Sequence, residues 1–259
     1  MSYRMALGVE YDGTDYLGWQ VQRHGPSVQA TVQQALSRLA NESIEVVCSG
    51  RTDAGVHGQC QVVHFDVHNE RSDRAFVLGA NSALPPDIAV LWAQRVPGDF
   101  HARFSARRRR YCYRLLNRPV RPALLARQVA WERRALNMLA MQQAAQSLLG
   151  EHDFSAFRTV HCQAPSPIRT LHALDLRQDG DVLEFHLEAN AFLHHMVRNI
   201  VGSLMVVGRG EAQPHWVGEV LSSRDRCQAG PTAPAAGLFF VGPRYPLAWQ
   251  LPDSVSADV

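Results

Sequence analysis

Alternating and helically spaced apolar residues in the first hundred positions predict a regular order of strands and helices. Strands are indicated at residues 5–11, 44–48, 59–67 and 88–96. Helices are predicted after Ser27 and Ser72, because serine is a favoured N-cap and apolar residues follow Ser27 at helical spacing. The resulting order, β-α-β-β-α-β, is that of a ferredoxin-like unit, in which helices cover one face of an antiparallel sheet.

The second half of the chain repeats this order. Strands are predicted at residues 110–117, 169–178, 182–189 and 237–241. Helices are predicted at residues 137–149 and 192–207, with a shorter one near 216–221. Two successive units of one topology indicate a duplicated α+β architecture with a cleft between its halves. We expect an N-terminal subdomain at 1–102, a C-terminal subdomain at 103–250 and a tail at 251–259, disordered from residue 254.

Composition excludes several classes of function. All 26 basic residues are arginine, so mechanisms that need lysine, such as Schiff-base chemistry or a P-loop, are ruled out. The five cysteines form no C-x-x-C pair, which argues against a disulfide framework and against a zinc site. Because there is no signal-peptide pattern and no long apolar run, we expect a soluble, cytoplasmic protein without a membrane segment.

Positive charge is concentrated in one stretch. Residues 101–134 contain 11 arginines and a single acid, Glu132, although the whole chain has a formal net charge of only +2. Such a local excess predicts a polyanionic partner, and the run from Arg107 through Arg108 and Arg109 to Arg110 is the candidate RNA-binding segment.

The strand that follows this run carries aromatic residues beside cations. Strand alternation places Tyr111 and Tyr113 on one face and Arg110, Cys112 and Arg114 on the other. Aromatic rings beside cations can hold an unstacked base above a neutralised backbone. The alternative is that both tyrosines are half-buried strand residues, which their strand propensity favours equally.

Two loops carry candidate polar chemistry. Residues 48–57 lie between two predicted strands, and Gly50 and Gly55 bracket a tight turn that presents Arg51 and Asp53. An exposed hairpin with an incidental charge pair is the competing interpretation. The glycine-punctuated loop at residues 12–20 is expected to expose its aromatic residues as a binding surface.

The predicted helix at 192–207 contains one arginine in a largely apolar run. A buried arginine is costly unless it is paired, and we nominate Asp53 as the partner of Arg198. His194 and His195 are adjacent, and adjacent helical residues point about 100° apart. They therefore cannot chelate one ion as helical neighbours, and we expect no metal.

Residues 50–57 (GRTDAGVH) closely resemble the catalytic signature of the tRNA pseudouridine synthase A family. Further blocks resemble that family in its own order: 11–14 (YDGT), 100–106 (FHARFSA), 110–113 (RYCY), 153–158 (DFSAFR), 192–199 (FLHHMVRN) and 237–240 (GLFF). The resemblance spans about residues 3–246, with small departures at Gly58, Cys60 and Pro243 that touch no proposed catalytic position.

The resemblance implies a cofactor-free isomerase that converts uridines at positions 38, 39 and 40 of the tRNA anticodon arm to pseudouridine. It also implies a homodimer of chains whose two halves share a continuous, mostly antiparallel sheet. Asp53 would be the essential carboxylate, as nucleophile on the sugar or the base, or as general base toward the ribose. Arg198 would pair with it and keep it ionised. The base-binding roles would fall to Arg51, which displaces or replaces the flipped base, Tyr111, which stacks on it, and Leu238, which walls the pocket.

Three other classes compete with this interpretation. A non-catalytic RNA-binding protein or chaperone could use the same sheet and arginines. A nucleoside hydrolase would also need a carboxylate at the sugar, but such enzymes usually need a second acid or a metal. A ribonuclease could use His57 and His64 if their side chains converged.

Overall fold

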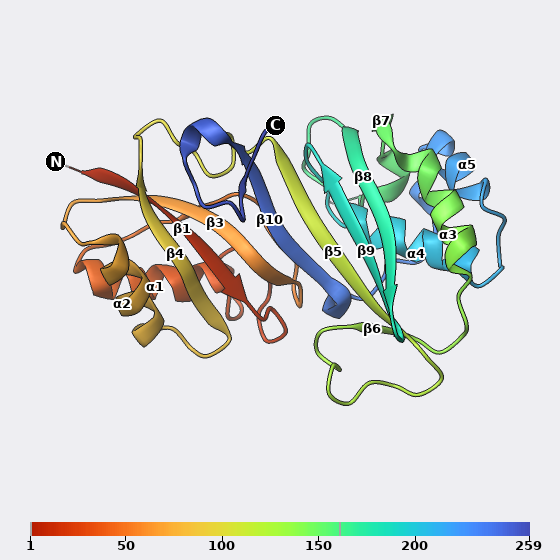
Figure 1. Cartoon of the computed structure of the whole chain (residues 1–259), viewed down its shortest axis with the longest axis horizontal. Coiled ribbons are helices and arrows are strands. Elements are labelled where there is room, and N and C mark those ends of the chain that lie inside the picture. Colours follow the sequence, from red (N-terminus) through yellow and green to blue (C-terminus); the bar gives the residue numbers. More distant parts are fainter. Residues whose placement is uncertain (1, 161) are drawn as a thin grey trace. The chain divides into compact units, whose positions relative to one another are not determined.

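The computed structural model describes residues 2–160 and 162–259, which form two compact units (Figure 1). Unit 1 comprises Met1–Arg108 and Phe239–Val259, and unit 2 comprises Arg109–Leu238. Each unit combines helices with a mostly antiparallel sheet, which confirms the predicted α+β class. Within the described residues, no helix is both long and apolar enough to cross a membrane.

Unit 1 has the strand order of a ferredoxin-like fold. Its elements are β1 (Tyr3–Tyr11), α1 (Val28–Ala40), β2 (Val47–Cys48), β3 (His57–Val67), α2 (Asp73–Ala83), β4 (Ile88–Val96), β10 (Leu238–Pro246), the 3-10 helix η5 (Leu247–Trp249) and β11 (Ser256–Ala257). The sheet runs β4-β1-β3, with β2 and β10 both on the outer edge of β3. Ser27 and Ser72 cap α1 and α2 as predicted, each accepting a hydrogen bond from a backbone amide.

The sheet of unit 1 is packed on both faces. One face of β1 and β3, including Leu7 and Phe65, joins the apolar sides of α1 and α2 in one core cluster. The opposite face, including Ala6 and Val62, packs with Phe100 and with Leu251 and Val255 of the C-terminal segment (residues 247–259). Because β3 is buried on both faces, it is a rigid support for the signature motif at residues 50–57, which leads directly into this strand.

Two predictions for unit 1 are wrong, one for the strand at 44–48 and one for the last residues of the chain. The predicted strand at 44–48 is reduced to two residues, because the amides of Ile44 and Val46 bond to the side chains of Ser37 and Gln33 instead of to a strand. The last residues are not disordered, since Val255 is fully buried and β11 pairs in parallel with β10.

Unit 2 contains most of the second repeat. Its elements are β5 (Arg108–Asn117), β6 (Ala130–Glu132), α3 (Met138–Ala145), β7 (Gly150–Asp153), β8 (Ile168–Asp179), β9 (Val182–Ala189), α4 (Met196–Gly208) and α5 (Trp216–Ser223), with 3-10 helices η1 (Gln146–Leu148), η2 (Ser155–Phe157), η3 (Arg226–Gln228) and η4 (Ala235–Gly237). The sheet order is β5-β9-β8-β7, and β6 pairs with β5. The last predicted strand of this repeat, β10, is counted in unit 1, where Phe239 pairs in parallel with His57.

The two faces of the unit 2 sheet differ in chemistry. Alternation along β5 buries Tyr113 and Leu115 on one side, opposite Phe185 and Leu183 of β9. The helices α3, α4 and α5 contact one another, and α3 also contacts β8. The other side carries charged residues such as Arg114.

Candidate active site

The signature loop (residues 49–56) is fixed by a buried glutamine of β3. The Gln61 side chain is completely buried, and its Oε1 accepts hydrogen bonds from the Ser49 hydroxyl at 2.7 Å and the Gly50 amide at 3.3 Å. Its Nε2 donates back to the Gly50 carbonyl. Because one side chain satisfies both backbone groups of Gly50, the entry to the loop has a single conformation. Sequence reasoning missed Gln61.

The 12–20 loop holds the signature loop from another side. The Thr52 carbonyl accepts from the Trp19 amide at 3.0 Å, and the Thr52 hydroxyl lies 2.8 Å from the Tyr11 hydroxyl. The expectation of exposed aromatics in the 12–20 loop is wrong, since Trp19 is 1% and Tyr16 7% exposed. These rings are buried where the 12–20 loop packs against the signature loop. There the Gly55 amide donates a hydrogen bond to the Tyr16 carbonyl.

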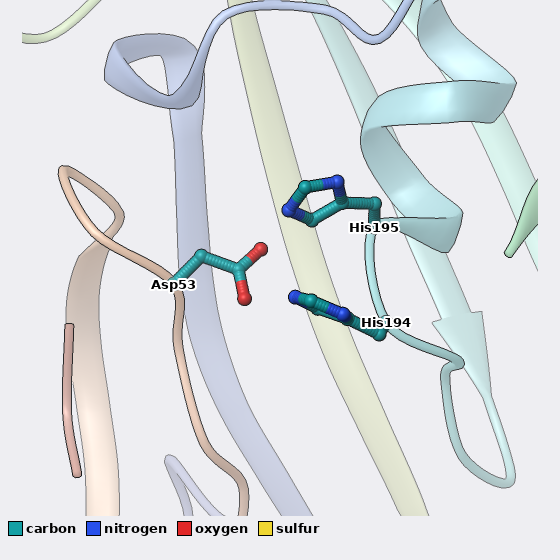
Figure 2. A group of neighbouring side chains, drawn as sticks. All are labelled: Asp53, His194 and His195. Atoms are coloured by element: carbon teal, nitrogen blue, oxygen red, sulfur yellow. The ribbon is translucent and has the colours of Figure 1, made fainter. Parts of the chain in front are cut away.

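Between these supports, the two polar residues of the signature loop remain accessible. Arg51 is exposed and Asp53 is half-buried. The Asp53 side chain leaves the loop just before β3 (Figure 2). The backbone carbonyl of Asp53 accepts from the Val56 amide at 3.2 Å, which closes the turn around it. A carboxylate on a rigid, open turn can approach a substrate without rearrangement of the loop.

Close approach of the two loops requires glycine at defined positions. A Cβ atom on Gly13 would lie 1.9 Å from the Val56 carbonyl oxygen, and one on Gly18, whose φ is +93°, would lie 2.6 Å from the Thr52 oxygen. A Cβ on Gly50 would meet only the Phe240 ring, at 3.7 Å, which is an ordinary contact.

Gly13→Ala is therefore expected to lower the free energy of unfolding by roughly 2 kcal/mol or more, because backbone atoms must separate to admit the methyl group. Gly50→Ala is the matched control and should unfold close to wild type. Urea denaturation followed by circular dichroism measures both. Equal midpoints for the two variants would mean that the 12–20 loop moves away at little cost.

His57 and His64, the two histidines of the ribonuclease alternative, are poor candidates for cleavage of an RNA chain. His57 is 2% exposed and stacks on Phe239, with ring centres 4.6 Å apart. His64 is 5% exposed and its Nδ1 accepts from the Ala102 amide; burial and the nearby Arg4 lower its pKa to about 4. Buried imidazoles with structural partners cannot reach a phosphodiester, which argues against the ribonuclease alternative.

Arg198, on the first turn of α4, has defined partners within unit 2. Its Nε donates to the Ala233 carbonyl at 2.7 Å, and its own backbone carbonyl accepts from the Ala233 amide at 3.1 Å. One terminal nitrogen lies 3.3 Å from His195 Nε2. These contacts fix the direction of a half-buried guanidinium. Its predicted partner, Asp53, belongs to unit 1, and that pair stays a prediction.

His194 and His195 do not lie on a helix, which corrects the prediction of a helix from residue 192. His195 has φ 62° and ψ 5°, a left-handed conformation, and α4 begins only at Met196 (Figure 2). The two imidazole rings are 4.3 Å apart, and His194 Nδ1 lies 2.9 Å from the Thr159 hydroxyl. The argument from helical angles against a shared ion is therefore wrong, and the absence of a metal stays a prediction.

The remaining predicted residues lie on β5 and β10 and in the arginine run. Tyr111 is half-buried and meets Phe192 edge to face at 4.9 Å, and Leu238, 5% exposed, begins β10. Arg107 is exposed, whereas Arg109 donates to the Asn190 carbonyl at 3.0 Å. Within the arginine run, Arg107 is therefore open to solvent, whereas Arg109 supports the sheet.

Among the residues of unit 2 that the structure describes, Cys112, Glu184 and His186 form a group with metal-ligating chemistry. Potential ligand atoms of Cys112, Glu184 and His186 lie within 4.8 Å of one another on the charged face of the sheet. Arg114 Nε donates to Glu184 Oε1 at 3.0 Å, and His186 Nε2 lies 2.9 Å from Oε2. Burial, with the Glu184 charge, raises the pKa of Cys112 to about 11, so the thiol is protonated at neutral pH. These contacts between β5 and β9 explain why the three side chains lie together: they belong to a cross-strand ion-pair network.

Comparisons with known proteins agree with the resemblance read from the motifs. A family profile described as tRNA pseudouridine synthase matches residues 8–105 and 144–246. A tRNA pseudouridine synthase A of Xylella fastidiosa (strain M23) is 60% identical over 254 residues, covering 98% of this chain and 99% of the relative. One of Xanthomonas oryzae pv. oryzae (strain PXO99A) is 58% identical over 255 residues, with the same coverage.

Among solved structures, a Cbf5-Nop10-Gar1 complex aligns with 91% of this chain and 48% of that chain, at 12% identity and a TM-score of 0.40. That alignment is too weak to bear on the assignment, which rests on the sequence matches. The family profile covers both halves of the chain, including the signature loop and the segment that leads into α4. The chain therefore belongs to the tRNA pseudouridine synthase family.

Proposed function

We propose that this protein isomerises uridines at positions 38, 39 and 40 of the tRNA anticodon arm to pseudouridine, with Asp53 as the essential carboxylate. The observation that carries the proposal is the signature loop itself. The loop lies within a family match that spans both halves of the chain. It presents a half-buried carboxylate on a turn held by Gln61 and by Tyr11, whose hydroxyl contacts that of Thr52.

The reaction is balanced without an added cofactor. The bond from ribose C1′ to N1 breaks, the uracil turns, C1′ bonds to C5, and the proton on C5 is released while N1 gains one. Atoms and oxidation level are conserved, so a carboxylate and a proton acceptor supply the chemistry. Asp53 acts as the nucleophile or as a general base toward the ribose. The base must first leave its stack, which costs a few kcal/mol.

The further residues take the roles that the family resemblance implies. Arg51, exposed beside Asp53, enters the space that the flipped base leaves. Tyr111 stacks on the uracil, and Leu238 supplies an apolar wall. Arg198, oriented by Ala233 and His195, pairs with Asp53 and keeps it ionised.

At the level of the whole molecule, the N-terminal subdomain at 1–102 carries the catalytic loop, and the subdomain at 103–250 carries the RNA-binding arginines Arg107, Arg108, Arg109 and Arg110. The protein acts as a homodimer in the cytoplasm. It binds the anticodon arm of tRNA and uses neither a metal nor a membrane.

The direct test is incubation of the purified protein with unmodified tRNA transcripts that carry uridine at positions 38, 39 or 40. We expect pseudouridine at those positions and an unchanged chain length and base count. Binding without pseudouridine would support an RNA-binding protein or chaperone instead. Free uracil would indicate a hydrolase, and a shortened chain a ribonuclease.

Salt dependence tests the arginine run. Affinity for tRNA should fall steeply with added salt, because phosphate contacts release counterions. Replacing Arg107 and Arg108 by glutamine should reduce the slope of log K against log salt by roughly 2, about 1 for each phosphate that is no longer neutralised. Glutamines at the exposed Arg38 and Arg74, on the unit 1 helices, make the same change in net charge and should leave the slope unchanged. An unchanged slope in the Arg107/Arg108 variant would place the RNA elsewhere.

A further inference from the structure

A series of rings runs from the core of unit 1 to its surface and ends at an exposed phenylalanine. Phe100 is fully buried and lies edge to face with His64 at 6.2 Å between ring centres. His64 lies 4.7 Å from His101, and His101 lies 4.2 Å from Phe104 with an angle of 30° between the ring planes. Phe104 is 72% exposed, so the series ends in solvent.

The turn that presents Phe104 is tightly constrained. His101 Nδ1 accepts hydrogen bonds from the amides of Arg103 and Phe104, both at 3.2 Å. The His101 amide donates to the Ser105 hydroxyl at 3.0 Å, and the Ser105 amide donates to the His101 carbonyl at 2.8 Å. Ala102, between them, is fully buried and bonds to His64. The ring of Phe104 is therefore held in solvent by a rigid turn and is not a loose side chain on a mobile loop.

The charge around the exposed ring suits a polyanion with aromatic bases. The Arg103 guanidinium carbon lies 5.6 Å from the centre of the Phe104 ring, and Arg107 is exposed three residues further along. Burial and the nearby arginines Arg4 and Arg103 lower the pKa of His101, so its ring is neutral at pH 7. A neutral, fixed aromatic surface with cations beside it matches the chemistry by which proteins hold unpaired bases.

We propose that Phe104, supported by His101, is a stacking platform for an unpaired nucleobase of the tRNA substrate, distinct from the uracil that reacts. The proposal rests on the proposed function, because it takes RNA as the ligand. The base adds one more ring to the existing series, and Arg103 neutralises the adjoining phosphate. Stacking is tolerant of base identity, so the platform contributes affinity and position rather than sequence specificity.

The test compares Phe104→Ala and Phe104→Trp with wild type, using an unmodified tRNA transcript and an anticodon-arm hairpin as probes. Phe104→Ala should bind about 5- to 150-fold more weakly, the range expected for removal of one base stack, with an unchanged salt slope. Phe104→Trp should bind at least as well as wild type, and its added tryptophan fluorescence should be quenched by the RNA. Leu78, 58% exposed on α2, provides the matched controls Leu78→Ala and Leu78→Trp, which should show neither effect.

The outcomes separate this platform from the proposed function. Pseudouridine formation by wild type on the same transcript tests the function alone. If wild type is active but Phe104→Ala binds within twofold of it, or if tryptophan at 104 is not quenched, the platform is rejected and the function stands. If Phe104→Ala instead changes the oligomeric state and leaves RNA binding intact, the ring serves a contact between copies of the chain, and the proposal is likewise overturned.

Discussion

Asp53→Asn is expected to bind tRNA nearly as well as wild type and to form no detectable pseudouridine. The substitution keeps the shape of the side chain and removes the ionised oxygen that the reaction needs. Loss of a nucleophile or essential base typically lowers turnover by about 10⁴-fold or more. The signature loop should keep its conformation, because hydrogen bonds from Gln61, Tyr11 and Trp19 hold it, together with the bond between the Asp53 carbonyl and the Val56 amide.

Single-turnover assays with excess enzyme, combined with direct binding measurements, check this result. Asp15→Asn is a suitable control, since Asp15 is an exposed carboxylate in the adjoining loop, and its loss changes the net charge in the same way. It should retain turnover. Mass spectrometry must establish that the introduced asparagine has not deamidated to aspartate. Turnover by a verified Asp53→Asn protein would remove Asp53 from the catalytic role.

Features set by local rules could be predicted from the sequence. The caps at Ser27 and Ser72 follow from the short reach of a serine hydroxyl to the amides of the first turn, and both are present. Strand alternation correctly placed Tyr113 and Cys112 on opposite faces of β5, because side chains alternate whatever the sheet packs against.

Features set by distant contacts could not be predicted. Gln61 is polar within an apolar alternation, and only the folded chain brings its amide against Gly50. The aromatic residues of the 12–20 loop lie in a polar, glycine-rich context typical of exposed loops, yet Trp19 is buried where that loop meets Thr52. Periodicity cannot detect contacts between loops.

The start of α4 shows how periodicity can extend an element too far. Phe192 and Leu193 continue the apolar spacing of the helix, so the pattern placed its first turn four residues early. The backbone instead turns at His195, which adopts a left-handed conformation, while His194 bonds to Thr159. A non-glycine residue in this conformation is costly and is commonly retained near functional sites. His195 contacts Arg198, which places this turn next to a predicted site residue.

Tyr111→Phe and Tyr111→Ala are expected to fail at different steps of the reaction. The ring of Tyr111 packs edge to face against Phe192, and this packing is kept in Tyr111→Phe but removed in Tyr111→Ala. If the ring stacks on the flipped uracil, Tyr111→Ala should lose roughly 1–3 kcal/mol at that base and fail before the glycosidic bond is exchanged. Overall tRNA affinity should change little, because the few kcal/mol needed to unstack this base offset what its stacking on Tyr111 contributes, a cost that an already unpaired base does not carry.

The hydroxyl of Tyr111 matters at a later step, when some base must remove the proton from C5 after the new carbon bond has formed. With uridine tritiated at C5, release of label reports that step, and analysis of the RNA reports the C1′ to C5 bond. Tyr111→Phe should form the bond but release tritium much more slowly than wild type. Wild-type release by this variant would confine Tyr111 to stacking, and full activity in Tyr111→Ala would remove it from the site.

Tyr113→Phe is the control that separates a chemical role of a tyrosine hydroxyl from a structural one. Tyr113 lies two residues along the same strand, is fully buried, and donates its hydroxyl to the Pro234 carbonyl at 2.9 Å. Losing that hydrogen bond should lower the free energy of unfolding by about 1 kcal/mol and leave the ratio of tritium release to bond formation at its wild-type value. A slowed release confined to Tyr111→Phe would therefore come from chemistry at the uracil, whereas slowing in both variants would come from a disturbed strand.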